Sequence, residues 1–143
     1  MMLAVGSARP RTVELPRDEM AFRMRYQRLL LAGRVTTVFR PGNRIHPNWR
    51  GYILGETVIA RVIERPGSDA HGIPPVFNDL RIPIRIRGLD VKGLNELTAE
   101  DFVGSSPDVV DVPGLIVHLN EIYGTPIAAF AGRVTRIHFD YPS

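Results

Sequence analysis

One segment dominates the interpretation of this sequence: Gly33-Arg34-Val35-Thr36-Thr37-Val38-Phe39-Arg40. A helix-like segment precedes it and stops at Gly33, the residue type expected just after a last helical turn. The β-branched and aromatic residues that follow predict a short strand over 36–39. The arginines on either side of this strand carry planar guanidinium groups that suit phosphate and carboxylate. The segment therefore combines a helix-to-strand junction with a candidate anion-binding site.

Upstream of Gly33, apolar residues recur at helical spacing and predict a helix within 20–32 through Phe22, Tyr26, Leu29 and Leu30. The first few residues of that range fit a short strand as well. Residues 1–19 contain glycine and prolines and show no sustained period. We interpret them as an N-terminal extension to a single domain that spans 20–143.

Downstream of Arg40, turn signals separate short strands. The first turn is Pro41-Gly42-Asn43. A continuous apolar run then predicts a strand over 56–64 that is covered on both faces. Strict alternation over 80–87 predicts a half-buried strand with a cationic outer face formed by Arg81, Arg85 and Arg87. Pro83 shares that outer face, which favours a strand edge or a bulge.

The last third of the chain predicts two helices and two strands. A short helix over 97–102 has Thr98 as its cap, and Asp111 caps a second helix that ends at Gly124. The second helix has an apolar stripe of Leu115, Ile116, Leu119 and Ile122. Strands over 126–130 and 133–139 follow. The fold class predicted is α+β, a small mixed β-barrel with flanking short helices.

The composition is that of an ordinary globular domain, with 143 residues of which 44% are hydrophobic and 23% charged. We expect no membrane span, no secretory leader and, because the chain has no cysteine, no thiolate chemistry. A cytoplasmic protein is the simplest interpretation. The net charge is +3, and 17 of the 18 basic residues are arginine. A general preference for arginine codons explains this number but not the clustering of the arginines.

The order of these motifs resembles the ASCH domain family of the PUA-like superfold, over about residues 20–141. Gly33 to Arg40 is similar to the family motif Gly-x-Lys-Thr-x-Thr-x-Arg, and Gly55-Glu56 to its Gly-Asp before the main barrel strand. Leu97-Thr98-Ala99-Glu100-Asp101 resembles the family's later helix start, and Ile122-Tyr123-Gly124 the end of its last helix.

The resemblance implies a cleft beside Gly33 to Arg40 that holds RNA, a nucleotide or a nucleoside. Some family members are amidohydrolases that use the motif's lysine and second threonine with a later glutamate, and others are described as ribonucleases. Here Val35 and Val38 stand at the lysine and second-threonine positions. Because valine can neither transfer a proton nor act as a nucleophile, we do not expect the amidohydrolase chemistry. The catalytic residues are left unassigned.

The candidate ligand-binding residues surround this motif. They are Arg34, Thr36, Thr37, Arg40, Arg44, Trp49, Arg50 and Glu56. Arginines would hold phosphate and Trp49 would stack on a base, as in single-strand-binding proteins. The alternatives are a salt bridge at the barrel rim, threonines that only favour a strand, and a tryptophan that anchors a loop. For Glu56 we expect an ion pair with Arg40 rather than contact with a ligand amine.

Three functions remain open from the sequence. The leading hypothesis is an RNA- or nucleotide-binding module without the amidohydrolase chemistry. The second is a nucleoside amidohydrolase or ribonuclease on the same scaffold, and the third is a structural or protein-interaction barrel, with a homodimer as an option. The outer arginines of 80–87 could form a phosphate track, protect a strand edge or pair with acidic residues. The four scattered histidines have no metal-ligand spacing, so we expect no metal and no cofactor.

Overall fold

The computed structural model describes residues 15–68, 71–123 and 132–142. Its strands are β2 (Glu19–Arg23), β3 (Thr37–Pro41), β4 (Thr57–Arg65), β5 (Val76–Phe77), β6 (Ile82–Gly93) and β7 (Arg133–Asp140). The α-helices are α1 (Gln27–Leu31) and α2 (Val112–Tyr123), and the 3-10 helices are η1 (Met24–Tyr26), η3 (Leu94–Glu96) and η4 (Ala99–Phe102). The predicted α+β class is therefore confirmed.

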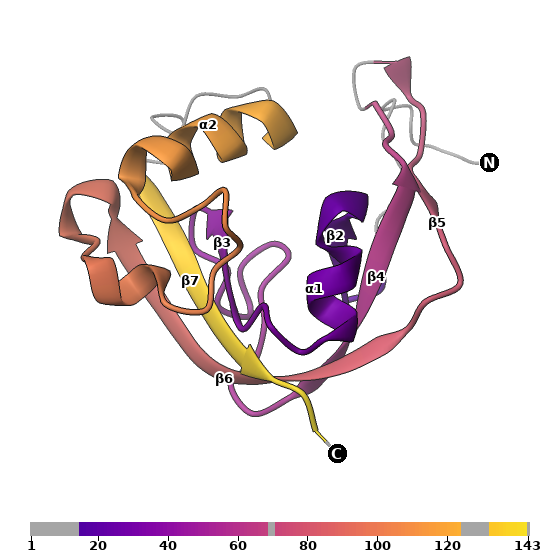
Figure 1. Cartoon of the computed structure of the whole chain (residues 1–143), viewed down its shortest axis with the longest axis horizontal. Coiled ribbons are helices and arrows are strands. Elements are labelled where there is room, and N and C mark those ends of the chain that lie inside the picture. Colours follow the sequence, from indigo (N-terminus) through magenta and orange to yellow (C-terminus); the bar gives the residue numbers. More distant parts are fainter. Residues whose placement is uncertain (1–14, 69–70, 124–131, 143) are drawn as a thin grey trace.

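The strands form one mixed, six-stranded sheet in the order β2-β4-β6-β7-β3, with β5 paired to β4. The β2–β4 pair is parallel, whereas β4–β6, β6–β7 and β3–β7 are antiparallel. The sheet curves strongly, α1 lies within the curve, and α2 lies across the side formed by β7 and β3 (Figure 1). Within the described residues the sheet is open, because β2 and β3 are its two ends and pair with β4 and β7 alone.

The residues before Gly33 divide into a strand and a short helix. In β2 the burial alternates, with Met20 and Phe22 buried, so the period of two determines the structure there. The helical spacing applies only from Met24 onward. Gly33 has a φ of +66° and donates its amide to Leu30 O, while Arg34 N bonds to Leu29 O at 2.8 Å. This pair of bonds is a Schellman motif, which confirms the helix end at Gly33.

The predicted strands over 56–64 and 80–87 are present as β4 and β6. In β4 the burial alternates between Val58, Ala60 and Val62, which are buried, and half-buried positions, so the strand is not fully covered on both faces. The longer β6 runs on to Gly93 because β7 pairs with it from Arg85 onward. Pro83 lies before that point and has a partner only on the β4 side. Because proline has no amide hydrogen, Pro83 could not donate a backbone hydrogen bond to β7, and at this position none is needed.

The helix caps are also as expected. Asp111 Oδ1 accepts a hydrogen bond from Gly114 N at 2.9 Å at the start of α2. Asp101 Oδ2 accepts one from Thr98 N at 2.9 Å at the start of η4, which is a 3-10 helix. Leu115 and Leu119 are buried, and Ile116 is half-buried. The side chain of Ile122, the predicted helix end at Gly124 and the predicted strand over 126–130 lie outside the described residues.

Two apolar clusters form the core. The larger one joins β2, β4, β6 and β7 with the first helical turns, and it contains Met20, Phe22, Val58, Ile84 and Phe139. The smaller one lies under α2 and η4 and contains Phe39, Phe102, Leu115, Leu119 and Val134. Because Val35 belongs to the larger cluster and Phe39 to the smaller one, the segment Gly33 to Arg40 connects the two.

Candidate ligand-binding cleft

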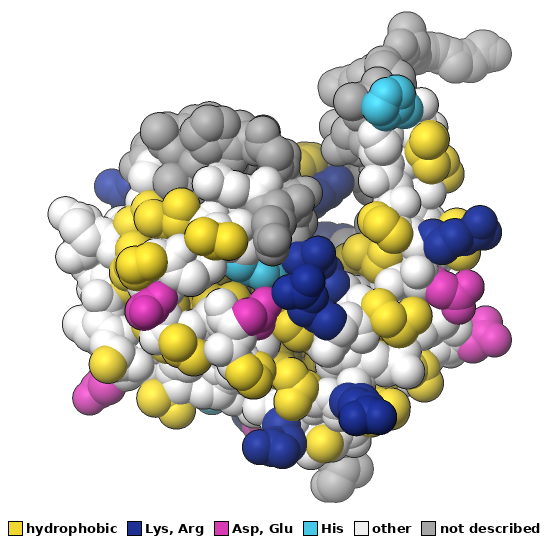
Figure 2. Space-filling model, turned by 45° about the horizontal axis from the view of Figure 1, so that its top comes forward, with side chains coloured by type: hydrophobic (Ala, Val, Ile, Leu, Met, Phe, Trp, Pro, Cys, Tyr) yellow, Lys and Arg dark blue, Asp and Glu magenta, His cyan; other side chains and the backbone are white. Residues whose placement is uncertain are grey.

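A cleft of about 840 Å³ lies where the two ends of the sheet, β2 and β3, face each other. Besides these strands, η1, the loop around residues 44–52 and the residues before and within α2 contribute to its walls. Figure 2 shows a hollow between the α2 side and the β4–β5 side of the molecule, with Lys and Arg side chains beside it. Among the residues that the structure describes, six arginines line the cleft, namely Arg17, Arg23, Arg25, Arg40, Arg44 and Arg50.

Arg40 bridges the two ends of the sheet. It projects from β3, and its Nη2 donates a hydrogen bond to Ala21 O of β2 at 2.7 Å. Its guanidinium carbon also lies 5.6 Å from the centre of the Phe22 ring, a cation–π arrangement. The side chain that the sequence predicts to hold a ligand is therefore also fixed in place across the cleft.

Arg44 and Arg50 surround Trp49 at the edge of the cleft. Their guanidinium carbons lie 5.4 and 4.2 Å from the centre of the Trp49 ring. Arg44 is only 4% exposed, and its Nε bonds to Pro41 O at 3.1 Å. Trp49 is 55% exposed and belongs to neither apolar cluster, so it presents ring surface to the solvent.

Arg50 has a φ of +54°, the left-handed region that non-glycine residues rarely adopt. The loop imposes this conformation through tight hydrogen bonds, including His46 N to Tyr52 O at 3.0 Å and Gly51 N to Asn48 O at 2.9 Å. Strained residues held by their surroundings are often found at ligand-binding loops.

The expected ion pair between Glu56 and Arg40 is wrong. Glu56 instead forms an ion pair with Arg17, and its Oε2 accepts a hydrogen bond from Ile53 N at 2.6 Å. The reason is position, because Glu56 precedes β4, whereas the hydrogen bond and ring contact of Arg40 are both with β2. Glu56 therefore acts on the cleft indirectly, by holding one of its arginines.

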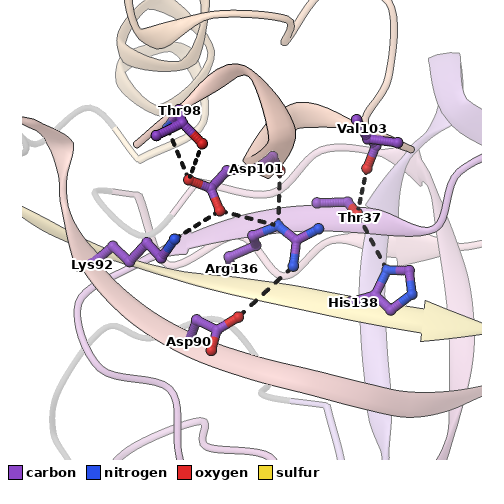
Figure 3. Close-up of polar contacts among 8 residues, drawn as sticks. All are labelled: Thr37, Asp90, Lys92, Thr98, Asp101, Val103, Arg136 and His138. Carbon is purple, nitrogen blue, oxygen red and sulfur yellow. Dashed lines mark hydrogen bonds and ion pairs between the residues drawn. The ribbon is translucent and has the colours of Figure 1, made fainter. Parts of the chain in front are cut away.

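The threonines and Arg34 are placed differently from the cleft arginines. Thr37 is buried and lines the cleft, and its Oγ1 donates to Val103 O at 2.8 Å (Figure 3). His138 Nδ1 lies 3.5 Å from the same oxygen. Thr36 packs against Gly104, and both threonine amides bond to Gly104 O. Arg34 is exposed and is outside the described lining of the cleft.

Tyr141 fixes the same segment from the C-terminal side. Its hydroxyl donates to Val35 O at 2.5 Å, and its ring lies against Gly33. Burial raises the pKa of Tyr141 to about 12, so this donor keeps its proton over the neutral range. Of the eight candidate residues, the described cleft lining thus includes Thr37, Arg40, Arg44 and Arg50, with Trp49 against its rim and Glu56 behind Arg17.

A polar cluster at the α2 side of the cleft was not predicted. Asp108 accepts hydrogen bonds from Tyr26 Oη at 3.1 Å, Ser106 Oγ at 2.7 Å and Arg25 Nη1 at 3.2 Å. Tyr26 Oη also lies 3.1 Å from His118 Nδ1. Except for Asp108, these residues line the cleft. The sequence offers no signal for this cluster, because Tyr26 and His118 are 92 positions apart.

The cluster perturbs two acid–base equilibria. Burial is the largest cause of the raised pKa of Tyr26. Burial also opposes ionisation of Asp108, but the hydrogen bonds from Ser106 and Tyr26 outweigh it and lower the pKa of that carboxyl. Near neutral pH, Asp108 is therefore an anion and Tyr26 a neutral hydrogen-bond donor.

A second polar network is structural. Figure 3 shows Asp101 of η4 between Lys92 and Arg136. Lys92 Nζ lies 2.8 Å from Asp101 Oδ1, and Arg136 Nε donates to Asp101 O at 2.8 Å. These contacts attach η4 to β6 and β7. None of the three residues is in the described cleft lining.

Two of the three arginines in the row have acidic partners, Arg81 just before β6 and Arg87 within it. Arg81 pairs with Glu19 at 3.2 Å and Arg87 with Asp140 at 2.6 Å. For Arg81 and Arg87, these pairs favour a role as partners of acidic residues rather than as a phosphate track. Among the described residues, no group of three or more His, Asp or Glu side chains could hold a metal ion. None of the described helices is long and apolar enough to cross a membrane.

Comparisons with known proteins find no protein-family model, no curated protein and no solved structure that matches this chain. The resemblance to the ASCH family therefore stays a prediction.

Proposed function

We propose that this protein is an RNA- or nucleotide-binding module whose ligand lies in the cleft between β2 and β3. One observation carries the proposal: among the described residues, six arginine side chains line a single cleft, against four carboxylates. Two of these, Glu19 and Glu64, are in the lining, and the other two, Glu56 and Asp108, pair with Arg17 and Arg25. Arginine is the residue type best suited to bind phosphate oxygens in pairs. The excess of positive charge favours an anionic ligand.

The apolar surface of the cleft supports a ligand that carries aromatic rings. Phe22, Phe39, Tyr52 and Phe77 contribute to its lining. At the rim, the exposed Trp49 ring lies against Arg50. One base could stack on this ring while the neighbouring phosphate binds the Arg50 guanidinium group. Phosphate groups alone would not need this apolar surface, whereas a nucleotide or a single strand uses both kinds.

The proposal extends to the fold and the setting. An ASCH-like domain of the PUA-like superfold, the family that the sequence resembles, agrees with the proposed ligand. A cytoplasmic location, where RNA and nucleotides are abundant, agrees with it too. The proposal needs no metal or cofactor, because the arginines supply the charge.

The lysine–threonine amidohydrolase chemistry receives no support from the residues of the motif. Val35 is 2% exposed and belongs to the core, so its position serves packing. Thr36 packs on Gly104, and no described carboxylate or histidine forms a hydrogen bond with it. Binding is therefore the better-supported function of this segment.

The test is the salt dependence of RNA binding, measured by fluorescence anisotropy with a labelled single-stranded oligomer. Each phosphate neutralised on a single strand contributes about −0.7 to the slope of log affinity against log salt concentration. If the cleft neutralises about four phosphates, affinity should fall about 50-fold between 50 and 200 mM salt. A flat salt response, or no binding, would contradict the proposal.

Two variants make this test specific to the cleft. Arg50→Asn removes a cleft charge, and asparagine tolerates the positive φ at this position. We expect about tenfold weaker binding. The slope of log affinity against log salt concentration should become shallower by about 0.7, the contribution of one neutralised phosphate. Arg28→Gln removes the same charge from the exposed surface of α1, outside the described cleft lining, and should leave the affinity within about twofold.

A further inference from the structure

The walls of the cleft are longer than a single nucleotide. Residues of β2 line one wall and residues of β3 line the other, and each of these strands has five residues. An extended strand rises about 3.3 Å per residue, so five residues of β2 cover about 16 Å. A nucleotide has about twice as many backbone bonds as an amino acid, so an extended nucleotide spans at most about 7 Å. The wall formed by β2 therefore has room for more than one nucleotide.

One end of the cleft lies at the start of β2 and carries an exposed aromatic ring. Arg17, shortly before β2, donates a hydrogen bond from Nη1 to Gly51 O at 3.3 Å. This contact brings the start of β2 to the loop that follows β3. In that loop the Trp49 ring is 55% exposed and lies 4.2 Å from the guanidinium carbon of Arg50. We call Arg17, Trp49 and Arg50 the stacking end, because an exposed ring beside arginines suits the face of a base.

The opposite end of the cleft lies after β2 and is polar. Tyr26 of η1 follows β2 directly, and its hydroxyl donates to Asp108 Oδ2 at 3.1 Å. The start of β3 reaches the same segment between η4 and α2, because Thr37 N bonds to Gly104 O at 3.1 Å. Hydroxyl and imidazole groups suit hydrogen bonds to the edge of a base. We call the three side chains of this kind in the described lining the polar end, namely Tyr26, Ser106 and His118.

Arg40 lies between the two ends. Its Nη2 donates to Ala21 O at 2.7 Å, and Ala21 is the central residue of β2. The guanidinium group is therefore held about half-way along the wall, where its charge favours a phosphate. A phosphodiester at this position has a nucleotide on each side, one toward the stacking end and one toward the polar end.

We propose that the ligand of this cleft is a single-stranded RNA segment of about three nucleotides, which reaches from the stacking end to the polar end past Arg40. This inference rests on the proposed function, because it names the ligand class of the same site, a strand rather than a free nucleotide. The bases are unpaired, because the stacking end takes the face of a base and the polar end its edge. Contacts at two linked positions increase affinity about 10²- to 10⁴-fold over either contact alone.

The experiment is isothermal titration calorimetry with 5′-phosphorylated oligouridylates, which carry one phosphate per nucleotide. Strands of one, two, three and six nucleotides are compared at the same salt concentration. We expect the trinucleotide to bind at least about 100-fold more tightly than the mononucleotide, because only the longer strand reaches both ends. Beyond three nucleotides the cleft is filled, so the hexanucleotide should gain at most about fivefold more.

Two further probes separate length from charge and from base pairing. Inorganic tripolyphosphate carries several negative charges and no base, and it should bind at least about 30-fold more weakly than the trinucleotide. A fully paired RNA duplex offers no base face to Trp49. As a competitor it should be at least about tenfold less effective than a single strand of the same length.

Two variants of Trp49 test the stacking end. Trp49→Ala removes the ring, so the gain in affinity from one to three nucleotides should fall below about tenfold. Trp49→Phe is the matched control, because it keeps an aromatic ring and should retain most of the gain. Both variants should fold, since the Trp49 side chain is exposed and belongs to neither apolar cluster.

Tyr26→Phe tests the polar end. It removes the hydroxyl that bonds to Asp108 and keeps the ring that packs in the larger apolar cluster. The gain from one to three nucleotides should decrease by about threefold or more. Thermal melts show whether each variant is folded, and the Trp49 pair decides the inference if Tyr26→Phe is not.

The outcomes separate this inference from the function on which it rests. A mononucleotide that binds within about tenfold of the trinucleotide would overturn the inference and leave nucleotide binding as the function. Tripolyphosphate that binds as tightly as the trinucleotide, or a full gain in Trp49→Ala, would also overturn the inference. If neither the mononucleotide nor any of the longer strands binds, both proposals are rejected.

Discussion

The cleft arginines are preorganised by specific neighbours. Arg40 is held by Ala21 O, Arg44 by Pro41 O, and Arg17 by Glu56. Rigid, long side chains lose less entropy when a ligand binds, so positioning of this kind increases affinity. The same neighbours place each guanidinium group in the wall of the cleft rather than in open solvent.

Alanine substitutions of Gly104 and Gly55 test how Thr36 of the segment Gly33 to Arg40 is packed. A Cβ at Gly104 would lie 2.1 Å from Thr36 Oγ1, and Gly104 has a φ of +84°. Gly55 has a similar φ of +87°, but a Cβ there would meet nothing within 4 Å beyond its chain neighbours. We expect Gly55→Ala to cost about 1 kcal/mol of unfolding free energy, from the left-handed backbone alone. Gly104→Ala should cost at least about 3 kcal/mol, because steric overlap is added.

Chemical denaturation measures both free energies, and Thr36→Ala in the Gly104→Ala background should recover part of the loss. Equal costs for the two glycine variants would contradict the close packing of Thr36 on Gly104. The sequence could not predict this role of Thr36, because its partner lies in a distant loop. A threonine in a short β-prone segment gives the same signal in a ligand site and in a packed strand.

At the scale of elements, segments with strong periodicity were predicted correctly from the sequence, whereas short segments were ambiguous or missed. The alternation of 80–87 identified β6, and Asp111 identified the start of α2. Residues 19–26 were ambiguous because five residues of β2 are too few to separate a period of two from helical spacing. The two-residue strand β5 has no periodicity and depends on its pairing with β4.

The attachment of η4 to the sheet predicts a pH dependence of stability. Burial opposes ionisation of Asp101, but the hydrogen bonds from Lys92 and Thr98 outweigh it and lower the pKa of Asp101 in the folded state. A group with a lowered folded pKa stabilises the fold above its unfolded pKa, and this contribution is lost as the pH falls through the folded pKa. Wild-type stability should therefore decrease steeply below about pH 4.

Asp101→Asn should remove this part of the acid response. At pH 7 it should lower the free energy of unfolding by about 1–2 kcal/mol, because a charged cap is lost. Once the pH has fallen below the lowered folded pKa of Asp101, the variant and the wild type should be similar in stability. Urea denaturation across pH 2.5–7 measures both curves, and a constant difference between them over that range would show that Asp101 is not ionised in the network.

At the scale of the whole molecule, the open sheet leaves β2 and β3 facing each other across the cleft, with Arg40 between them. No local pattern shows which arginines meet in one place, since this depends on the order of all the strands. The sequence identified Arg40, Arg44 and Arg50, which lie near one motif, but missed Arg17, Arg23 and Arg25 on the other side. Long-range convergence, rather than local structure, accounts for most of what the sequence did not reveal.

Arg40→Gln tests the bridge between the two ends of the sheet. The loss of a charged hydrogen bond should cost about 1–2 kcal/mol of unfolding free energy. Hydrogen–deuterium exchange should become faster in β2 and β3 and remain unchanged in β6 and β7. Arg87→Gln breaks an exposed ion pair with Asp140 and should cost less than about 0.5 kcal/mol. If both variants behave alike, Arg40 does not connect the two ends.

The location of bound RNA tests the central claim most directly. In heteronuclear NMR, backbone amides are followed while a single-stranded RNA oligomer is added to the folded protein. The account predicts chemical-shift changes in β2, β3, η1 and residues 44–52, which surround the cleft. Changes confined to the outer face of β6, around Arg81, Arg85 and Arg87, or no changes at all, would contradict it.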